Sequence, residues 1–399
     1  MKYLILGGGP AGLSFANRLL QNGETDFLVL EKEAEAGGLC RSREVDNSPL
    51  DIGGGHFLDV KNPEVLDFVF PFMPMEEWDS YTRDSRIEIN GTMINSPIEA
   101  NIWQMSLSDQ VAYLKAIAVA GCNLNEEMPE RFVDWIYWKL GKKIAEDYMI
   151  PYNQKMFGED LNALGTYWLD KLPNVSFEET LISCLERKAY GTQPGHAQFY
   201  YPKKYGSGEL WLRMARALGD KIKYGIGVKE IDFDRKIVNG EYRAEVIINT
   251  IPWKTFRTCI GLPAAFAKNI EALKYSSVVI EYHQEKLSIP AHWVYCPNPE
   301  LSYHRILVRH NFCPNSVGYW TETNLTRFQA EGKSADAYFV NEYAYPLNTV
   351  GKQEKIAALL EWARTKEVYG LGRWGEWQHY NSDVVVLLAI RLADRLMQK

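Results

Sequence analysis

The sequence contains no C-x-x-C pair, although it has six cysteines. They are scattered over the chain as Cys40, Cys122, Cys184, Cys259, Cys296 and Cys313. Zinc and dithiol sites need cysteines at short, regular spacing. We therefore expect no metal site, and we expect thiols that stay reduced, as is typical of a cytoplasmic protein.

Long apolar runs and basic stripes are also missing. No apolar stretch reaches the roughly 18–20 residues that a membrane-spanning helix needs. The first residues begin a strand at once, which leaves no room for a signal peptide. The formal net charge is −7, with acidic and basic residues interspersed, whereas nucleic-acid binding requires clustered positive charge. We expect a cytoplasmic protein with no membrane span and no nucleic-acid partner.

The sequence does have the length and apolar content for several domains. Its 399 residues exceed the size at which a single hydrophobic core keeps growing. Hydrophobic residues make up 46% and aromatic residues 13% of the chain. This composition excludes intrinsic disorder and suits a pocket lined by aromatic rings, so we expect a small-molecule substrate.

A strand, a glycine-rich turn and a helix open the chain. Lys2–Leu6 predicts a short strand, residues 7–12 read Gly-Gly-Gly-Pro-Ala-Gly, and Leu13–Asn22 has the apolar spacing of a helix. A second strand, Phe27–Leu30, ends in Glu31. This order of elements is typical of the start of a doubly wound parallel sheet.

The glycine-rich turn predicts a dinucleotide site. Its glycines permit a tight turn, close approach of the backbone to a pyrophosphate, and close packing of helix on strand. Glu31, at the end of the second strand, can accept both ribose hydroxyls; the alternative is an ordinary solvated strand-end acid. The candidate cofactor residues in this region are Gly7, Gly9, Pro10, Ala11, Gly12, Glu31 and Lys32.

The next motif distinguishes a flavin from NAD. Residues 37–42 read Gly-Gly-Leu-Cys-Arg-Ser. Here the chain resembles the superfamily of flavin amine oxidases, protoporphyrinogen oxidases and UDP-galactopyranose mutases, in which a Gly-Gly doublet followed by Arg-Ser runs along the flavin and its diphosphate. Glycine lets backbone approach the flavin, and Arg41 is a permanent cation; a surface turn is the alternative. The resemblance implies FAD, and no cysteine or histidine marks a covalent flavin link.

Helical and strand patterns alternate along the rest of the chain. Gln110–Ala120, Phe132–Leu140 and Lys142–Met149 predict helices, and the last of them should end at Pro151. Strand patterns lie at Lys221–Ile231, Ala244–Ile251, Val278–Tyr282 and His304–Arg309, and Asp383–Leu396 predicts a final helix.

We therefore expect an α/β protein with a two-dinucleotide-binding, Rossmann-like FAD fold, an inserted helical domain and a mixed or antiparallel β-sheet substrate domain. The expected division runs along the chain as follows: FAD-binding 1–75, helical insert 76–194, FAD-binding 195–258, β-sheet substrate domain 259–340 and FAD-binding 341–399.

A more particular resemblance, to UDP-galactopyranose mutases and especially their eukaryotic branch, runs through nearly the whole chain. Its motifs are Asp51–Phe57, Tyr148–Lys155, Tyr201–Trp211, Tyr303–Arg305, Tyr343–Pro346, Tyr369–Trp377 and Asn381–Asp383. The resemblance implies further cofactor residues at Gly38, Leu39, Gly55, His56, Val228, Thr250, Gly372, Arg373 and Asp383. It implies substrate-binding residues at Asn153, Trp168, Arg305 and Tyr345, and catalytic residues at His56, Arg305, Tyr345, His379 and Tyr380.

For His56 and Arg373 a purely structural role is the alternative to contact with the cofactor. His56 could face the flavin or bond a turn carbonyl. Arg373 could contact the cofactor or stack on Trp374. His379 and Tyr380 compete for the position at which the family has a tyrosine that reaches the ligand diphosphate.

The substrate candidates also have alternatives. Arg305 lies on an apolar strand, so it must meet an anion, either a protein carboxylate or a ligand diphosphate, and we favour the ligand. Tyr345 could present its hydroxyl to a phosphate or lie at an interface. Trp168 could pack in the core or against a sugar.

The chain departs from the mutase pattern where the family holds uracil. The stretch Asn95–Glu99 has Ser96 and Ile98 in place of the aromatic pair, and Glu99 in place of an amide. The helical segment after Trp168 has Leu172 where an arginine is expected, preceded by Lys171. Nucleotide selectivity should therefore differ from that of the family or be lost.

Three functions remain open. The first is a mutase that contracts and expands the ring of a nucleotide sugar without net redox change, through N5 of the reduced flavin. The second is an oxidase or dehydrogenase of the amine oxidase and protoporphyrinogen oxidase class. The third is an accessory flavoprotein that has lost turnover. A homodimer is compatible with all three.

Overall fold

The computed structural model describes residues 1–59, 61–158, 160–169, 172–191, 197–332 and 337–398. The chain forms two compact units. Unit 1 consists of Met1–Ser80, Tyr200–Lys274 and Gly351–Lys399, and unit 2 consists of Tyr81–Phe199 and Tyr275–Val350. Both units are therefore built from segments that are distant in sequence.

Unit 1 is organised around a parallel five-stranded sheet with the order β10-β2-β1-β14-β21. Its strands are β1 (Tyr3–Leu6), β2 (Phe27–Leu30), β10 (Ile222–Lys223), β14 (Val246–Asn249) and β21 (Val368–Gly370). The strands are short apolar runs because the sheet is covered on both faces. From β1 the order runs one way through β2 and β10 and the other way through β14 and β21, which is a doubly wound topology.

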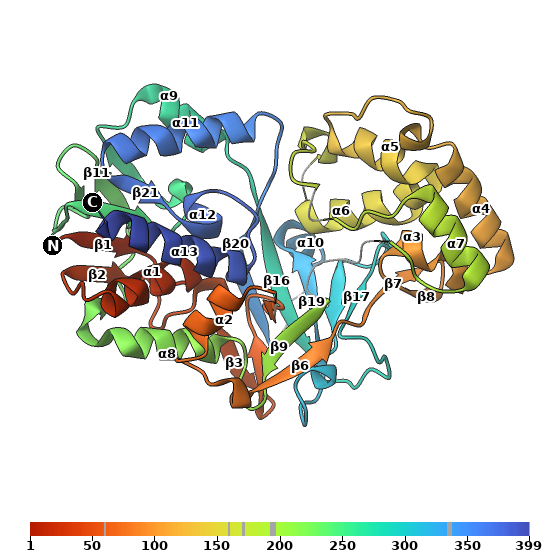
Figure 1. Ribbon diagram of the computed structural model, residues 1–399, viewed down its shortest axis with the longest axis horizontal. Coiled ribbons are helices and arrows are strands. Elements are labelled where there is room, and N and C mark those ends of the chain that lie inside the picture. The colour runs from red at the N-terminus through yellow and green to blue at the C-terminus, as the bar shows by residue number, and fades with distance from the viewer. Residues whose placement is uncertain (60, 159, 170–171, 192–196, 333–336, 399) are drawn as a thin grey trace. The chain divides into compact units, whose positions relative to one another are not determined.

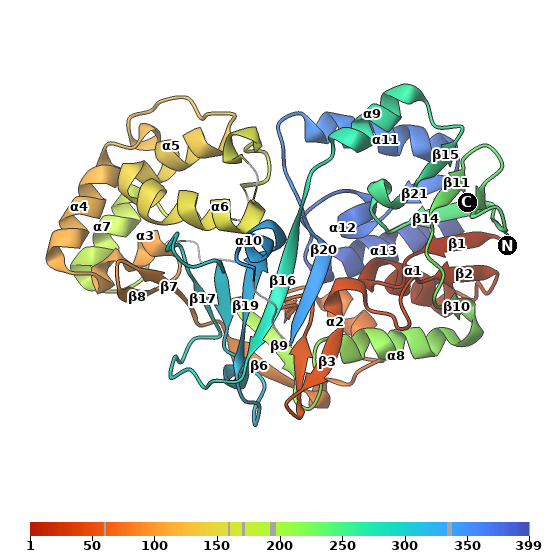
Figure 2. The same ribbon diagram turned by 180° about the vertical axis from the view of Figure 1, so that it is seen from behind.

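Helices cover this sheet. α1 (Pro10–Gln21), α8 (Gly208–Leu218) and α13 (Ser382–Met397) share one apolar core cluster with β1 and β2. Figures 1 and 2 show α1 and α13 side by side, both contributing buried apolar residues to that cluster. On the opposite side α11 (Lys352–Thr365) packs against β21 and α9 (Ala264–Ala272).

Smaller elements complete unit 1. They are α2 (Pro63–Val69), α12 (Gly372–Gly375), the sheet of β13 (Tyr242–Arg243), β12 (Ile237–Val238), β11 (Glu230–Asp232) and β15 (Thr258–Ile260), the pair β3 (Ser42–Val45) and β4 (Ser48–Asp51), and the sheet of β5 (Leu58–Asp59), β9 (Gln198–Pro202) and β6 (Trp78–Thr82). Two of them, β6 and β9, include the points at which the chain leaves and re-enters this unit. The single strand expected over Lys221–Ile231 is wrong: the chain forms β10 and then β11, with Gly225 at φ 73° between them. A left-handed residue interrupts an extended strand.

Unit 2 contains a mixed seven-stranded sheet with the order β20-β16-β19-β18-β17-β7-β8. Its strands are β20 (Tyr338–Pro346), β16 (Tyr275–His283), β19 (Tyr319–Asn324), β18 (Arg305–Leu307), β17 (Trp293–Tyr295), β7 (Ser85–Ile89) and β8 (Thr92–Asn95). β17 and β7 pair in parallel, and the other described pairings are antiparallel.

A helical segment shares a core with part of this sheet. Its helices are α3 (Ile98–Asn101), α4 (Leu107–Ala118), α5 (Phe132–Ile144), α6 (Ile150–Phe157) and α7 (Phe177–Glu186), and α10 (Leu325–Ala330) follows β19. Buried side chains from α4, α5 and α6 form one cluster with Ile87, Ile89 and Ile94 of β7 and β8. The helical segment therefore belongs to the same folding unit as the sheet.

The prediction that a helix ends at Pro151 is wrong. The chain leaves helical geometry at Gly141 (φ 72°), as two adjacent helices predict, but then continues through the π-helical turn η5 (Ala145–Met149) into α6. Pro151 lies in the first turn of α6. Proline is tolerated there because the first turn has no partner for its missing N–H.

The fold is an α/β fold with an inserted helical segment and a mixed sheet. Among the helices in the described part of the chain, none is both long and apolar enough to cross a membrane.

Candidate flavin and substrate sites

The carboxyl edge of the unit 1 sheet gathers most of the cofactor residues proposed from the sequence. The strand order reverses between β1 and β14, so the loops after these two strands diverge at that edge, where α/β sheets bind ligands. Gly7 follows β1 and Thr250 follows β14. The Thr250 hydroxyl donates to the Leu6 carbonyl oxygen at 2.6 Å, which ties the two loops together.

Two of the glycines around the loop after β1, Gly7 and Gly12, have a backbone or packing reason to be glycine. Gly7 has φ 104°, a value that favours glycine. A Cβ on Gly12 would lie 2.0 Å from the Gly7 carbonyl oxygen, so only glycine lets α1 pack against the loop. The nearest atoms to a Cβ on Gly9 would be Gly38 Cα at 3.7 Å and Gly38 N at 4.0 Å, so Gly9 itself has space within the protein.

The start of α1 supplies anion-binding groups. Its N-cap is Gly9, no side chain caps it, and Pro10 occupies the first turn. The first N–H groups of a helix have no partner within the helix, and the helix dipole favours negative charge there. The loop and helix start therefore fit the diphosphate of a dinucleotide, with Ala11 and Gly12 offering N–H groups.

Glu31 lies beside this loop as a buried carboxylate, 5% exposed. One oxygen accepts the Gly8 N–H at 2.7 Å and the other accepts the Glu33 N–H at 2.8 Å. Burial raises the pKa of Glu31, and these two N–H groups oppose that rise. A carboxylate oxygen accepts more than one hydrogen bond, so Glu31 could still receive ribose hydroxyls.

The Gly-Gly-Leu-Cys-Arg motif lies against the same loop. Gly38 (φ 55°) opens the 3₁₀ turn η1 (Gly38–Cys40), and a Cβ on it would meet Gly9 Cα at 3.2 Å. Arg41 Nε donates to the Gly38 carbonyl oxygen at 2.9 Å, and its Nη1 lies 3.5 Å from Glu33. The two glycine motifs are thus in contact. Leu39 lies in the 3₁₀ turn between Gly38 and Arg41, whose positions these contacts fix.

Asp51 joins three segments of unit 1 beneath this motif. Its side chain is fully buried and accepts hydrogen bonds from the Ser42 hydroxyl (2.6 Å), the Tyr201 hydroxyl (3.1 Å) and the Ser207 N–H (3.0 Å). Burial raises the pKa of Asp51 to about 6, which the three donors only partly oppose. This residue was missed from the sequence, although it opens the glycine-rich stretch 51–57.

His56 makes the structural contact of the two that were considered, a bond to a turn carbonyl oxygen. Its Nε2 lies 3.2 Å from the Gly53 carbonyl oxygen. The ring remains partly exposed, as does Gly55 before it. The turn contact holds the imidazole, and a role facing the flavin remains a proposal.

The closing segment follows the last strand of the sheet. A Cβ on Gly372 (φ 75°) would lie 2.7 Å from the Ala11 side chain, so this segment runs against the start of α1. Arg373 donates from Nε and Nη2 to the Tyr380 carbonyl oxygen at 3.1 and 2.8 Å. Its guanidinium therefore holds the loop that carries His379 and Tyr380, both of which are partly exposed.

Buried polar groups fix this segment from within. Lys352 is 1% exposed, and its Nζ donates to the Trp377 carbonyl oxygen at 2.7 Å. Glu376 accepts the Gly372 N–H at 3.0 Å, and burial raises its pKa to about 7. Burial likewise raises the pKa of Tyr380 to about 12.

The remaining cofactor candidates lie in unit 1 as well. Val228 is 7% exposed, in the loop before β11. Asp383 is in the first turn of α13, where the helix dipole favours a carboxylate. Lys32 is largely exposed and lies 3.5 Å from Glu33. Its only described ion-pair partner is thus a neighbouring surface acid.

In unit 2, Arg305 meets a protein carboxylate. Its Nε and Nη2 donate to Glu322 Oε2 at 2.9 and 2.5 Å across the β18–β19 pair. Nη2 also lies 3.4 Å from the Tyr345 hydroxyl, so the two residues implied by resemblance are together. Burial disfavours the charged carboxylate, but Arg305 outweighs it and lowers the pKa of Glu322 to about 2. Glu322 could not be identified from the sequence, because nothing in β19 reveals its partner on another strand.

Tyrosines line the surroundings of Arg305. Tyr152 packs edge-on against Tyr295 (5.4 Å between ring centroids) and at 5.7 Å from Tyr148. The Tyr295 hydroxyl accepts hydrogen bonds from Arg83 Nη2 at 3.0 Å and from Trp293 Nε1 at 3.0 Å. The cluster combines aromatic faces with hydroxyl groups and could contact a sugar or another polar ring.

Asn153 and Trp168 are held by the helical segment itself. Asn153 is 4% exposed and donates to the Met149 carbonyl oxygen at 2.7 Å. The Trp168 ring packs on Phe132 at 5.1 Å, and its Nε1 donates to the Gly165 carbonyl oxygen at 2.7 Å. These contacts match the core alternative for Trp168, although part of its ring is exposed.

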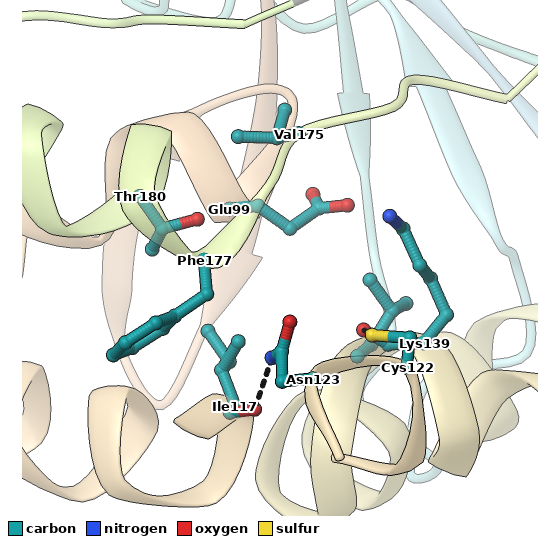
Figure 3. Close-up of a pocket in the computed structure, with 9 residues that line it drawn as sticks. Glu99, Ile117, Cys122, Asn123, Lys139, Val175, Phe177 and Thr180 are labelled. Carbon is teal, nitrogen blue, oxygen red and sulfur yellow. Dashed lines mark hydrogen bonds between the residues drawn. The ribbon is translucent and has the colours of Figure 1, made fainter. Parts of the chain in front are cut away.

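In the stretch that departs from the mutase pattern, Ile98 and Glu99 are buried, whereas Ser96 is partly exposed and Asn95 is exposed. Ile98 is 1% exposed and belongs to the core of the helical segment. Figure 3 shows Glu99 and Lys139 extending toward each other over a cavity of about 10 Å³, room for one water molecule. Burial raises the pKa of Glu99. Asp170 and Lys171 lie outside the described residues, and Leu172 packs against the same core.

A model of the family described as flavin containing amine oxidoreductase matches residues 10–284. The uncharacterized protein in nifH2 3'region of Methanothermococcus thermolithotrophicus is 34% identical over 109 residues, which cover 26% of this chain and 98% of that protein.

Solved structures are similar over the whole chain at low identity. The structure of a reduced UDP-galactopyranose mutase has a TM-score of 0.87 at 21% identity. The match covers 100% of this chain and 94% of the mutase chain. Cyclohexylamine oxidase from Brevibacterium oxydans has a TM-score of 0.69 at 14% identity, with 99% of both chains covered. These likenesses show the fold.

Proposed function

The chain belongs to the flavin-containing amine oxidoreductase family, and from that premise we propose that it is an FAD-dependent mutase that interconverts ring forms of a nucleotide sugar. FAD would be bound non-covalently by the Gly7–Gly12 loop, Glu31, the Gly38–Arg41 motif and the Gly372–Arg373 segment. When bound and reduced, the flavin would supply N5 as the nucleophile toward the sugar.

One observation carries the choice of an anionic substrate: the orientation of the Arg305 guanidinium. Glu322 takes the side of the group formed by Nε and Nη2, so the edge formed by Nη1 and Nη2 points elsewhere, beside the Tyr345 hydroxyl. Two parallel N–H groups on such an edge match two oxygens of a phosphate. An amine substrate would gain nothing from a cation at this position.

The protein's own residues would then bind and orient. Arg305 and Tyr345 would hold the diphosphate as it leaves the sugar and until it returns, with His379 or Tyr380 as a further contact. The tyrosines around Tyr152 would contact the sugar. Residues 1–75, 195–258 and 341–399 would act as the FAD-binding domain, and 76–194 and 259–340 would provide the substrate side.

A second candidate function is oxidation of an amine. The observation that favours it is the cluster of Tyr148, Tyr152 and Tyr295, since aromatic faces attract organic cations. The family to which the chain belongs is also described by this activity.

The two functions separate in one experiment. The purified protein is reduced with dithionite under nitrogen, incubated with a panel of nucleotide sugars, and the products are resolved by chromatography and NMR. In parallel, the oxidised protein is incubated with primary amines in an oxygen electrode. Ring-isomerised sugar formed only after reduction supports the mutase. Oxygen uptake with an amine, with no sugar product, would overturn it in favour of the oxidase.

A further inference from the structure

Arg305 has a permanent partner on the neighbouring strand. Arg305 and Glu322 are directly paired residues of β18 and β19, so their side chains lie on the same face of the sheet. The Glu322 side chain is 1% exposed, whereas that of Arg305 is 21% exposed. The pair therefore has a buried carboxylate at its base and a guanidinium that extends toward a partly open surface.

The two carboxylate oxygens of Glu322 are used unequally. Oε2 accepts from both Nε and Nη2 of Arg305, and the buried Oε1 has no hydrogen-bond partner in the described part of the chain. Behind it, Nε2 of the fully buried His304 lies 3.6 Å from Oε2, beyond hydrogen-bond range. The carboxylate is thus committed to Arg305.

From this geometry we propose that Glu322 is a positioning residue that aims Arg305 and lowers the affinity of its open edge for anions. The proposal rests on the proposed binding of a diphosphate at Arg305. A side-on contact through Nε and Nη2 fixes the plane of the guanidinium, which leaves the N–H groups of Nη1 for the ligand, while the second N–H of Nη2 is directed at the Tyr345 hydroxyl. The negative charge of Glu322 also lies close to any anion at that edge and repels it.

This arrangement suits a diphosphate that must leave the sugar and then bind to it again. An arginine without a carboxylate partner would hold a diphosphate more tightly both before and after the reaction, which adds binding energy without favouring the transition state. Glu322 would weaken ground-state binding while it preserves the orientation of Arg305.

Two variants separate the two roles. Glu322→Gln retains an acceptor oxygen at the same place and removes the charge, whereas Glu322→Ala removes both. Glu281→Gln is the matched control, because Glu281 is a buried carboxylate, 9% exposed, in the same sheet. It pairs with Thr321, so its side chain lies on the opposite face from that of Glu322.

The experiment measures binding of inorganic pyrophosphate to the FAD-loaded protein by titration calorimetry, and KM and kcat for whichever nucleotide sugar is turned over. We expect Glu322→Gln to bind pyrophosphate about tenfold more tightly, with lower KM and lower kcat. We expect Glu322→Ala to lose at least tenfold in kcat/KM, because Arg305 is no longer oriented. Glu281→Gln should behave as the wild type.

Distinct results would overturn the proposal and the function on which it rests. If the wild type binds pyrophosphate but Glu322→Gln binds it equally or more weakly, Glu322 serves only the fold. A wild type that binds neither pyrophosphate nor any nucleotide sugar would instead reject the proposed substrate class. Melting temperatures of all variants identify any general loss of stability.

Discussion

The candidate sites of the two units consist of different kinds of group, backbone in unit 1 and side chains in unit 2. In unit 1 the site consists mainly of backbone: glycines at Gly7, Gly9 and Gly12, and the uncapped start of α1. In unit 2 it consists of side chains, with Arg305 held by Glu322 from a neighbouring strand. A backbone site depends on conformation and space, whereas a side-chain site depends on the pairing of charges.

Buried carboxylates show the same difference. Asp51 in unit 1 accepts hydrogen bonds only from neutral donors, and burial raises its pKa to about 6. Glu322 in unit 2 is also buried, but the Arg305 cation lowers its pKa to about 2. Comparable burial thus has opposite electrostatic consequences, depending on whether a cation is present.

The strongest test of the backbone site is Gly9→Val. We expect this variant to fold and to lose FAD, because a Cβ at Gly9 has room within the protein but would occupy the place of the pyrophosphate. Flavin absorbance per mole of protein and circular dichroism measure the two properties. Ala265→Val, at an exposed position of α9, is the control. Full FAD occupancy in Gly9→Val would show that the site is elsewhere.

The contrast between the carboxylates predicts opposite pH effects on stability. The folded pKa of Asp51, about 6, exceeds its ordinary value of 3.8, so the folded state binds more protons between these values. The contribution of Asp51 to the free energy of unfolding is therefore present below pH 4. It is lost as pH rises through 6, which lowers the free energy of unfolding by about 2–3 kcal/mol. For Glu322 the folded pKa is lowered, so its contribution is present above pH 4.5 and is lost as pH falls toward 2.

Asp51→Asn checks the first of these effects. Its free energy of unfolding, measured in urea from pH 4.5 to 7.5, should fall less with rising pH than that of the wild type. The difference between the two proteins isolates this one group. Parallel pH curves for the variant and the wild type would mean that Asp51 ionises normally.

Arg305→Lys tests the side-chain site alone. We expect normal FAD content and an affinity for nucleoside diphosphates about 10- to 100-fold lower, because one ammonium cannot serve both Glu322 and a phosphate with paired N–H groups. Calorimetry and flavin absorbance measure the two outcomes. Arg86→Lys, which alters another arginine of the same sheet that pairs with a carboxylate, Asp84, is the control. Loss of flavin in Arg305→Lys would indicate that Arg305 serves the fold.

The smallest expected effect concerns the nucleotide base. Ile98 is buried in the core and Glu99 lines an internal cavity, so neither can hold a flat ring. We expect UDP and inorganic pyrophosphate to bind the reduced protein within about tenfold of each other, since a stacked base would add on the order of 1–3 kcal/mol. Trp103 is the aromatic residue nearest to this stretch in sequence, so it is the ring that could substitute for the missing pair. Tight, uracil-dependent binding that survives Trp103→Ala would contradict this expectation.

The sequence predicts the two sites to different extents. In unit 1 the spacing of Gly7, Gly9, Gly12 and Glu31 is local, so the strand, turn and helix around them could be derived without a structure. The strand pattern at Ala244–Ile251 also predicts the return of the chain at β14, whereas the strand β21 is not predicted from the sequence. Contacts of Glu31 with Gly8 and Glu33 could not be derived, because they depend on the path of the loop.

In unit 2 the sequence indicates only that Arg305 needs an anion. Its partner comes from a strand 17 residues away, and alternation along a strand does not reveal which strands are neighbours. Resemblance placed Tyr345 near Arg305, and the structure has them in contact. For Asn153 and Trp168 the structure shows bonds to nearby carbonyl oxygens, which a motif alone does not predict. For His56 it shows the bond to a turn carbonyl oxygen that was one of the two alternatives.

The π-helical turn Ala145–Met149 allows this part of the chain to differ by one residue in length without turning α6. A π turn completes one rotation with about one residue more than an α turn, so the extra residue is accommodated within the turn itself. Deletion of one residue here would convert the π turn to an α turn and leave the orientation of α6 nearly unchanged. Lys155, whose Nζ donates to the carbonyl oxygens of Cys296 and Asn298 at 2.7 Å, would keep both acceptors. Alignments of this region should therefore allow single-residue gaps at 145–149.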